Sequence, residues 1–159
     1  MASATRELLA VREDVWRFLA EPYHLSDWWP GIVGVEPDRR GFSVGARWRV
    51  STVSNPLPIV LLSRLPRIGR PSGPTGIQTL VIGEIAAPER WAWQLVPGAR
   101  AGREGRVQAA LVEVTLRALD PDRTEATVDV SGLGQRRDLQ LARTAADRLY
   151  DLVQTAAAL

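Results

Sequence analysis

The 159-residue sequence predicts an α+β domain in which an antiparallel sheet of about seven strands is covered by one long C-terminal helix. The strands are indicated by apolar and charged residues that alternate with a period of two, as where Trp48 lies between Arg47 and Arg49. This alternation is typical of antiparallel strands with one dry face. The helix is indicated by a single apolar stripe over residues 135–157. Because a dry face must be covered, we expect the helix to lie on it.

The first part of the chain is predicted to form one strand and two short helices. Residues 3–11 have strand character, and Glu13 and Asp14 follow where acidic groups favour the start of a helix. Pro22 ends that helix and is suited to begin a second short helix that runs through Asp27. These elements precede the main run of strands.

Six further strands are expected before the long helix. Their predicted ranges are about 32–37, 45–54, 77–86, 90–96, 107–119 and 124–131. Residues 120–123, Asp-Pro-Asp-Arg, predict a tight hairpin between the last two strands. In the long helix, Arg143 and Asp147 lie one turn apart, so we expect them to pair.

Two segments interrupt this pattern. Residues 55–76 combine five prolines with many apolar residues, which predicts a long inserted loop with room for one helical turn around 59–65. Residues 98–105 predict a second, more polar loop. The first loop has enough apolar surface to dock on the domain, and loops of such length are usually functional or disordered.

Composition excludes several kinds of chemistry. The chain has no cysteine, so it has no disulfides, no thiolate nucleophile and no zinc site of the cysteine type. His24 is the single histidine, which excludes a site with several histidine ligands. All 20 basic residues are arginine, so lysine Schiff-base chemistry is excluded as well. We therefore expect no metal and no cofactor.

Length and charge indicate one domain over 1–159 and no nucleic-acid partner. A chain of this length can bury a stable hydrophobic core without disulfides or bound metal ions. The 18 carboxylates nearly balance the arginines and leave a formal charge of +2, which does not indicate a general polyanion binder. The N-terminus shows no secretory signal, and the longest apolar stretch, 59–62, is too short to span a bilayer. We expect a cytoplasmic protein without stable membrane insertion.

Several short motifs occur in an order that resembles the helix-grip (SRPBCC) superfamily, which includes START domains, Bet v 1-like proteins and bacterial polyketide cyclase or dehydrase-like proteins. The matching motifs are Val15-Trp16, Trp28-Trp29-Pro30-Gly31, the segment 44–48, the segment 83–91 and the closing helix. The resemblance covers nearly the whole chain. It implies a curved sheet that wraps the long helix and leaves an apolar cavity, with ligand binding as the general role and catalysis in some branches.

Acid–base catalysis would need an ionisable group held in that cavity. By alternation, most charged residues of the strands fall on the face opposite the apolar residues. Glu84 is the exception, because its strand is apolar on both faces and its direction cannot be determined. Glu84, Tyr150 and His24 are therefore the candidate catalytic residues, although a lone histidine is more often a surface or capping residue.

Aromatic residues are the candidate ligand contacts. The set comprises Trp28, Trp29, Trp48, Trp91, Trp93 and Tyr150. Their alternative role is plain core filling, and in this fold the two roles do not exclude one another.

Three functions are compatible with these observations. The leading hypothesis is binding of an apolar or aromatic small molecule, such as a lipid, a polyketide or a similar metabolite, between the sheet and the C-terminal helix. The second is an enzyme of the polyketide aromatase or cyclase type, and the third is a protein-interaction module that uses 55–76. The same segment could also serve as a lid over the cavity, as a homodimer contact or as a site that approaches lipid.

Overall fold

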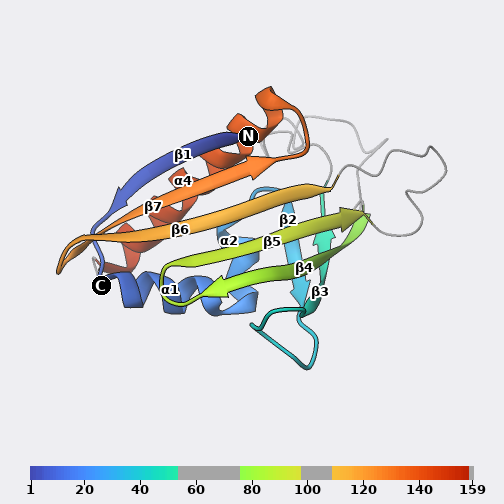
Figure 1. Ribbon diagram of the computed structural model, residues 1–159, viewed down its shortest axis with the longest axis horizontal. Helices are drawn as coiled ribbons and strands as arrows, with labels where there is room; N and C mark the ends of the chain where they lie inside the picture. The colour runs from blue at the N-terminus through green and yellow to red at the C-terminus, as the bar shows by residue number, and fades with distance from the viewer. Residues whose placement is uncertain (54–75, 98–108, 158–159) are drawn as a thin grey trace, which may run out of the picture.

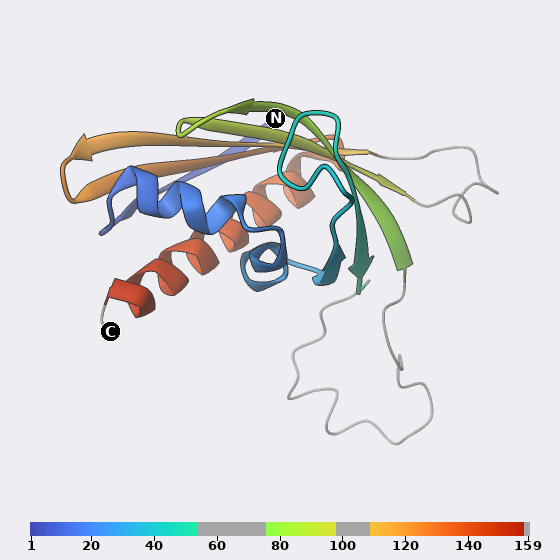
Figure 2. The ribbon, with the colours of Figure 1, turned by 90° about the horizontal axis from the view of Figure 1, so that it is seen from below.

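The computed structural model describes residues 1–53, 76–97 and 109–157, and it confirms the predicted α+β helix-grip architecture. A seven-stranded antiparallel sheet forms one layer, and the helices cover one of its faces (Figures 1 and 2). The chain begins with β1 (Ala2–Leu8), α1 (Arg12–Ala20), the 3-10 turn η1 (Pro22–His24) and α2 (Leu25–Trp28). The later elements are β2 (Ile32–Glu36), β3 (Arg47–Thr52), β4 (Gly76–Ala86), β5 (Arg90–Pro97), β6 (Ala110–Asp120), β7 (Arg123–Ser131) and α4 (Gln135–Ala157).

The strands are ordered β1-β7-β6-β5-β4-β3-β2 in the sheet. All neighbouring pairs are antiparallel, and the first strand of the chain pairs with the last. In that pair Thr5 lies opposite Thr127, and their hydroxyl groups are 3.1 Å apart. The two edges of the sheet are therefore β1 and β2.

The strands predicted over 3–11 and 45–54 were too long. The strand expected over 3–11 ends at Leu8, because Val11 already acts as the N-cap of α1 and its carbonyl accepts hydrogen bonds from the Asp14 and Val15 N–H groups. The strand expected over 45–54 begins at Arg47. Gly45 has a φ of 87°, a left-handed conformation that a strand residue does not adopt.

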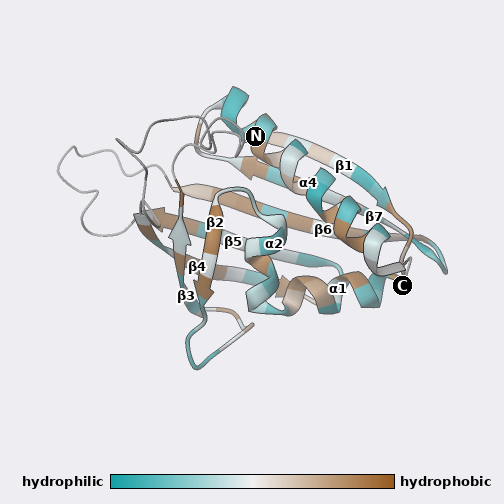
Figure 3. Ribbon diagram, turned by 180° about the vertical axis from the view of Figure 1, so that it is seen from behind, coloured by the Kyte–Doolittle hydropathy of each residue, from teal (hydrophilic) through white to brown (hydrophobic). Residues whose placement is uncertain are grey.

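The predicted dry face of the sheet is confirmed. Along the strands, apolar and polar residues alternate as brown and teal segments in Figure 3. The inward residues are at most 2% exposed and comprise Trp48, Val50, Leu80, Ile82, Trp91, Trp93, Val112, Val114, Leu116, Ala126 and Val128. Arg47, Arg49 and Arg117 are exposed on the opposite face, as the alternation predicted.

Helix α4 lies across β1 and β7 and also contacts α2. Its buried stripe contains Ala142, Ala146 and Leu149, as predicted. The expected pair between Arg143 and Asp147 was wrong, because the Asp147 carboxylate accepts a hydrogen bond from Arg6 of β1 at 2.8 Å. A strand packed beside the helix thus supplies the cation.

Candidate functional site

Five tryptophans fill the middle of the space between the sheet and the helices. Trp28, Trp29, Trp48, Trp91 and Trp93 are each at most 2% exposed. Trp29 and Trp93 pack edge to face with ring centroids 4.8 Å apart, and Trp48 lies 5.9 Å from Trp91. This arrangement makes the tryptophans part of the hydrophobic core.

The indole N–H groups of this cluster differ in their hydrogen bonding. The Trp48 indole donates to the Gly41 carbonyl at 2.8 Å. The indole nitrogens of Trp28, Trp91 and Trp93 are buried and have no acceptor among the described residues. Because a buried donor without an acceptor costs about 1–3 kcal/mol, we expect these three N–H groups to stabilise the core less than the Trp48 N–H group does.

A pocket remains at the end of the sheet where β3 and β5 finish and α4 begins; we call it the open-end pocket. Its volume is about 210 Å³. The described residues that line it are Trp29, Pro30, Gly31, Ile32, Thr52, Val53, Gln78, Leu95, Ala110, Leu133 and Leu141. It therefore lies between the sheet and the N-terminal half of α4, and the sequence predicted ligand binding between the sheet and this helix.

Backbone contacts fix the walls of the open-end pocket. Gly31 has a φ of 85° in the turn after α2, and its carbonyl accepts a hydrogen bond from Val53 N–H at 2.8 Å. This bond joins the segment that enters β2 to the end of β3. On the helix side, Leu133 N–H donates to the buried carboxylate of Asp138.

The described lining of the open-end pocket contains no ionisable side chain. Its polar side-chain groups come from Thr52, Gln78 and the Trp29 indole. The Thr52 hydroxyl donates to the Gly76 carbonyl at 3.3 Å. Such a surface can bury an apolar molecule and orient it with a few hydrogen bonds, but it supplies no general acid or base.

Glu84 lies away from this pocket. Its side chain is 47% exposed and forms an ion pair with Arg90. It lies directly opposite Ala92, whose neighbours Trp91 and Trp93 point inward, so Glu84 is on the outer face of the sheet. The bulge between Ile82 and Glu84 sets this direction, which could not be determined from the sequence.

His24 and Tyr150 are also outside the described lining of the open-end pocket. The His24 ring stacks on Phe18 with centroids 4.3 Å apart, and its Nδ1 is 2.9 Å from the Phe18 carbonyl oxygen. The Tyr150 hydroxyl accepts a hydrogen bond from Gln154, and the Arg6 guanidinium lies 4.1 Å from its ring centroid. Among the described contacts, no hydrogen bond joins any two of the three candidate catalytic residues.

Of the six candidate ligand contacts, Trp29 lines the open-end pocket and Trp93 packs directly on Trp29. Contact with a ligand stays a prediction for all six residues: Trp28, Trp29, Trp48, Trp91, Trp93 and Tyr150. Gln78, Leu133 and Leu141 were not among the predicted ligand contacts, and the fold brings them together from β4, the turn after β7 and α4. Their position near the ends of strands and the start of the helix was the signal that could have pointed to them.

The described residues contain no group of three histidine or carboxylate side chains placed to hold a metal ion. No helix among them is long and apolar enough to cross a membrane. The predicted loops at 55–76 and 98–105 lie essentially outside the described residues.

The architecture and this pocket define a helix-grip domain, and solved structures share the fold. No family model matches the sequence, and no curated protein matches it significantly. The structure is similar to protein MLL2253 from Mesorhizobium loti, with a TM-score of 0.61 and 16% identity over 96% of this chain and 94% of that one. A protein from Arthrobacter aurescens gives a TM-score of 0.62 and 18% identity over 96% of this chain and 85% of that chain.

The fold is also similar to part of the di-domain ARO/CYC StfQ from the steffimycin biosynthetic pathway. The TM-score is 0.66 at 17% identity, over 99% of this chain and 46% of StfQ. The chain therefore spans about half the length of that protein. At these identities the likeness establishes the helix-grip fold.

Proposed function

We propose that this helix-grip domain binds a small apolar or aromatic molecule in the open-end pocket. The observation that carries the proposal is the described lining itself, which is predominantly apolar, free of ionisable side chains and situated between the sheet and α4. An apolar cavity of about 150 Å³ holds benzene. The volume of about 210 Å³ therefore suits one substituted ring or a branched chain of similar size.

Burial of apolar area drives this binding. It contributes about 25 cal/mol for each Å² removed from water, and Trp29, Leu95 and Leu141 supply much of the apolar wall. Gln78 and Thr52 lie at the same wall and provide hydrogen-bonding groups that orient a substituent of the ligand. A longer lipid or a molecule of several rings would extend beyond the described lining.

The test is isothermal titration calorimetry with toluene and p-cresol, two probes of matching size that differ by one hydroxyl group. We expect both to bind the wild-type protein. Leu141→Trp and Leu133→Trp each place an indole in the pocket and should weaken binding at least about tenfold, because the apolar area is no longer available. Leu119→Trp, at a 38% exposed position near the other end of β6, is the size-matched control.

Two results would refute this function: binding of neither probe, or equal binding by wild type and both folded pocket variants. Circular dichroism establishes which variants fold.

The enzymatic alternative, a polyketide aromatase or cyclase reaction, has the likeness to StfQ in its favour. It lacks support from the described positions of Glu84, Tyr150 and His24, which are not joined in one site. The interaction alternative rests on 55–76, which the structure leaves almost wholly undescribed.

A further inference from the structure

A second cavity lies at the opposite end of α4, where the β6–β7 hairpin approaches α1; we call it the hairpin-end cleft. Its volume is about 340 Å³. Apolar side chains of Leu9, Val15, Phe18 and Leu152 line it, together with the acidic residues Asp14 and Asp122. Leu152 is eleven residues along α4 from the open-end pocket residue Leu141, or about 16 Å at 1.5 Å per residue. The two cavities are therefore separate.

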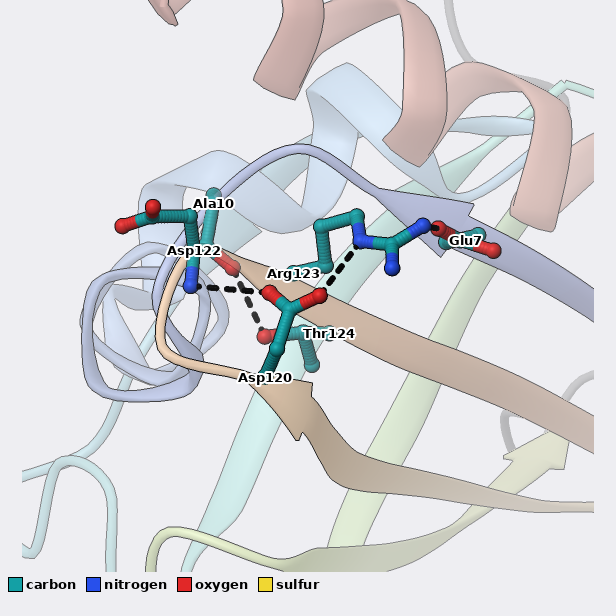
Figure 4. A network of polar contacts seen from close by, with 6 residues as sticks. All are labelled: Glu7, Ala10, Asp120, Asp122, Arg123 and Thr124. Carbon is teal, nitrogen blue, oxygen red and sulfur yellow. Dashed lines mark hydrogen bonds and ion pairs between the residues drawn. The ribbon is translucent and has the colours of Figure 1, made fainter.

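The hairpin beside the cleft carries more negative than positive charge. The Arg123 guanidinium donates to Asp120 at 2.7 Å and also pairs with Glu7, so two carboxylates share one cation (Figure 4). The side chain of Asp122 points away from Asp120 and Arg123 in Figure 4. It forms no ion pair with any described residue. Asp122 thus brings an uncompensated negative charge to the cleft.

The end of α4 adds to this negative potential. A helix carries partial negative charge at its C-terminus, and α4 has no basic residue in its last turn. Leu152 and Val153, which line the cleft, are in the last two turns of this helix. Asp14 contributes less, because it lies in the first turn of α1, where a helix favours an acidic group, and is 3.5 Å from Arg17.

We propose that the hairpin-end cleft binds a cationic amphiphile, a molecule with an ammonium group at one end and an unbranched or ring-shaped apolar body. The apolar body lies against Val15, Phe18 and Leu152, and the ammonium group lies beside Asp122. Leu9 and Val11 extend the apolar surface at the opening, with 52% and 37% of their surface exposed. An anionic amphiphile of the same length is disfavoured by the same charges.

The experiment compares n-octylammonium, octanol and octanoate by isothermal titration calorimetry at neutral pH and low salt. We expect octylammonium to bind about tenfold more tightly than octanoate. The expected difference is modest because the head group would meet Asp122 at a solvent-exposed position, where water weakens interactions between charges. Each CH₂ removed from the alkylammonium chain should weaken binding about fourfold, which corresponds to about 0.8 kcal/mol. Asp122→Asn should weaken octylammonium binding about two- to fivefold and leave octanol binding unchanged.

Leu152→Trp should reduce binding of both octylammonium and octanol by filling the cleft. Val33→Trp is the control, because Val33 is 55% exposed in β2 and lies outside the lining of the cleft. Equal or tighter binding of octanoate would overturn the proposal. So would unchanged octylammonium affinity in Asp122→Asn, an exposed substitution that keeps the core intact even if Leu152→Trp fails to fold.

Discussion

The buried carboxylate of Asp138 accepts a hydrogen bond from the Leu133 backbone N–H at 3.1 Å. Asp138 belongs to the first turn of α4, and Leu133 is part of the wall of the open-end pocket. The Asp138 backbone N–H in turn donates to the Gly134 carbonyl at 2.9 Å. Through its side chain and its backbone N–H, Asp138 therefore ties the start of the helix to one wall of the pocket.

Asp138→Ala should lower the free energy of unfolding by about 1–3 kcal/mol, because it removes a hydrogen bond to a charged group and leaves Leu133 N–H without its acceptor. Asp138→Asn keeps an acceptor oxygen and should cost less. Urea denaturation followed by circular dichroism measures both. Equal stability of Asp138→Ala and the wild type would show that this hydrogen bond does not stabilise the turn.

Trp48 and Trp91 form a matched pair, since both are fully buried and their N–H groups differ in hydrogen bonding. Replacement by phenylalanine creates a similar cavity at either position. Trp48→Phe also leaves the Gly41 carbonyl without its donor, whereas Trp91→Phe removes a donor that has no described acceptor. We expect Trp48→Phe to be the less stable variant by about 1 kcal/mol in urea denaturation. The reverse order would contradict this explanation.

Thr124 is fully buried, and its hydroxyl donates to the Ala10 carbonyl at 2.8 Å, which ties the β7 strand to the turn before α1. Thr124→Val has nearly the same volume but removes the donor. It should lower the free energy of unfolding by about 1 kcal/mol. Thr115→Val, in the neighbouring strand β6, is the control because the Thr115 hydroxyl forms no hydrogen bond with the described residues, and it should change the free energy of unfolding by at most about 0.5 kcal/mol. Thermal unfolding of both variants decides the matter.

Asp120 should give the protein part of its acid sensitivity. Its hydrogen bond from Arg123 lowers the pKa of Asp120 below the ordinary value of 3.8, and the same contact raises the pKa of Arg123. A carboxylate with a lowered pKa in the folded state stabilises the fold above 3.8 and loses this effect as the pH falls through the lowered value.

Asp120→Asn should therefore be less stable than the wild type at neutral pH, and the difference should shrink as the pH falls below 3.8. Tryptophan fluorescence in urea at several pH values between neutrality and 2 measures this difference. Asp122→Asn is the control, because the Asp122 carboxylate forms no ion pair among the described residues. A difference that stays constant with pH would exclude this role of Asp120.

Local patterns in the sequence were sufficient to predict the sheet, its dry face and α4. The alternation around Trp48 and the helical stripe that includes Ala142 and Leu149 each depend on neighbours within a few residues. The predicted ion pair between Arg143 and Asp147 was wrong because the partner of Asp147 is distant in the sequence. Spacing along one helix does not reveal that Arg6, from strand β1, pairs with Asp147.

The candidate site was less predictable than the fold. The same alternation placed Trp48, Trp91 and Trp93 on the inner face, but it did not show that the rings pack against one another and fill the centre. The space they leave is bounded by residues such as Gln78 and Leu141, which are brought together by topology. The packing of side chains from several elements, which local sequence patterns do not reveal, therefore shapes the pocket.

The pairing of β1 with β7 has a consequence for how the protein is made. Thr5 bonds to Thr127, a partner 122 residues later in the chain. During synthesis on the ribosome, β1 emerges long before β7 and has no partner strand until β7 follows. Sheets closed by such distant contacts fold slowly, and an unpaired strand is open to association with other chains meanwhile. Translation rate and chaperone supply should therefore influence the yield of folded protein.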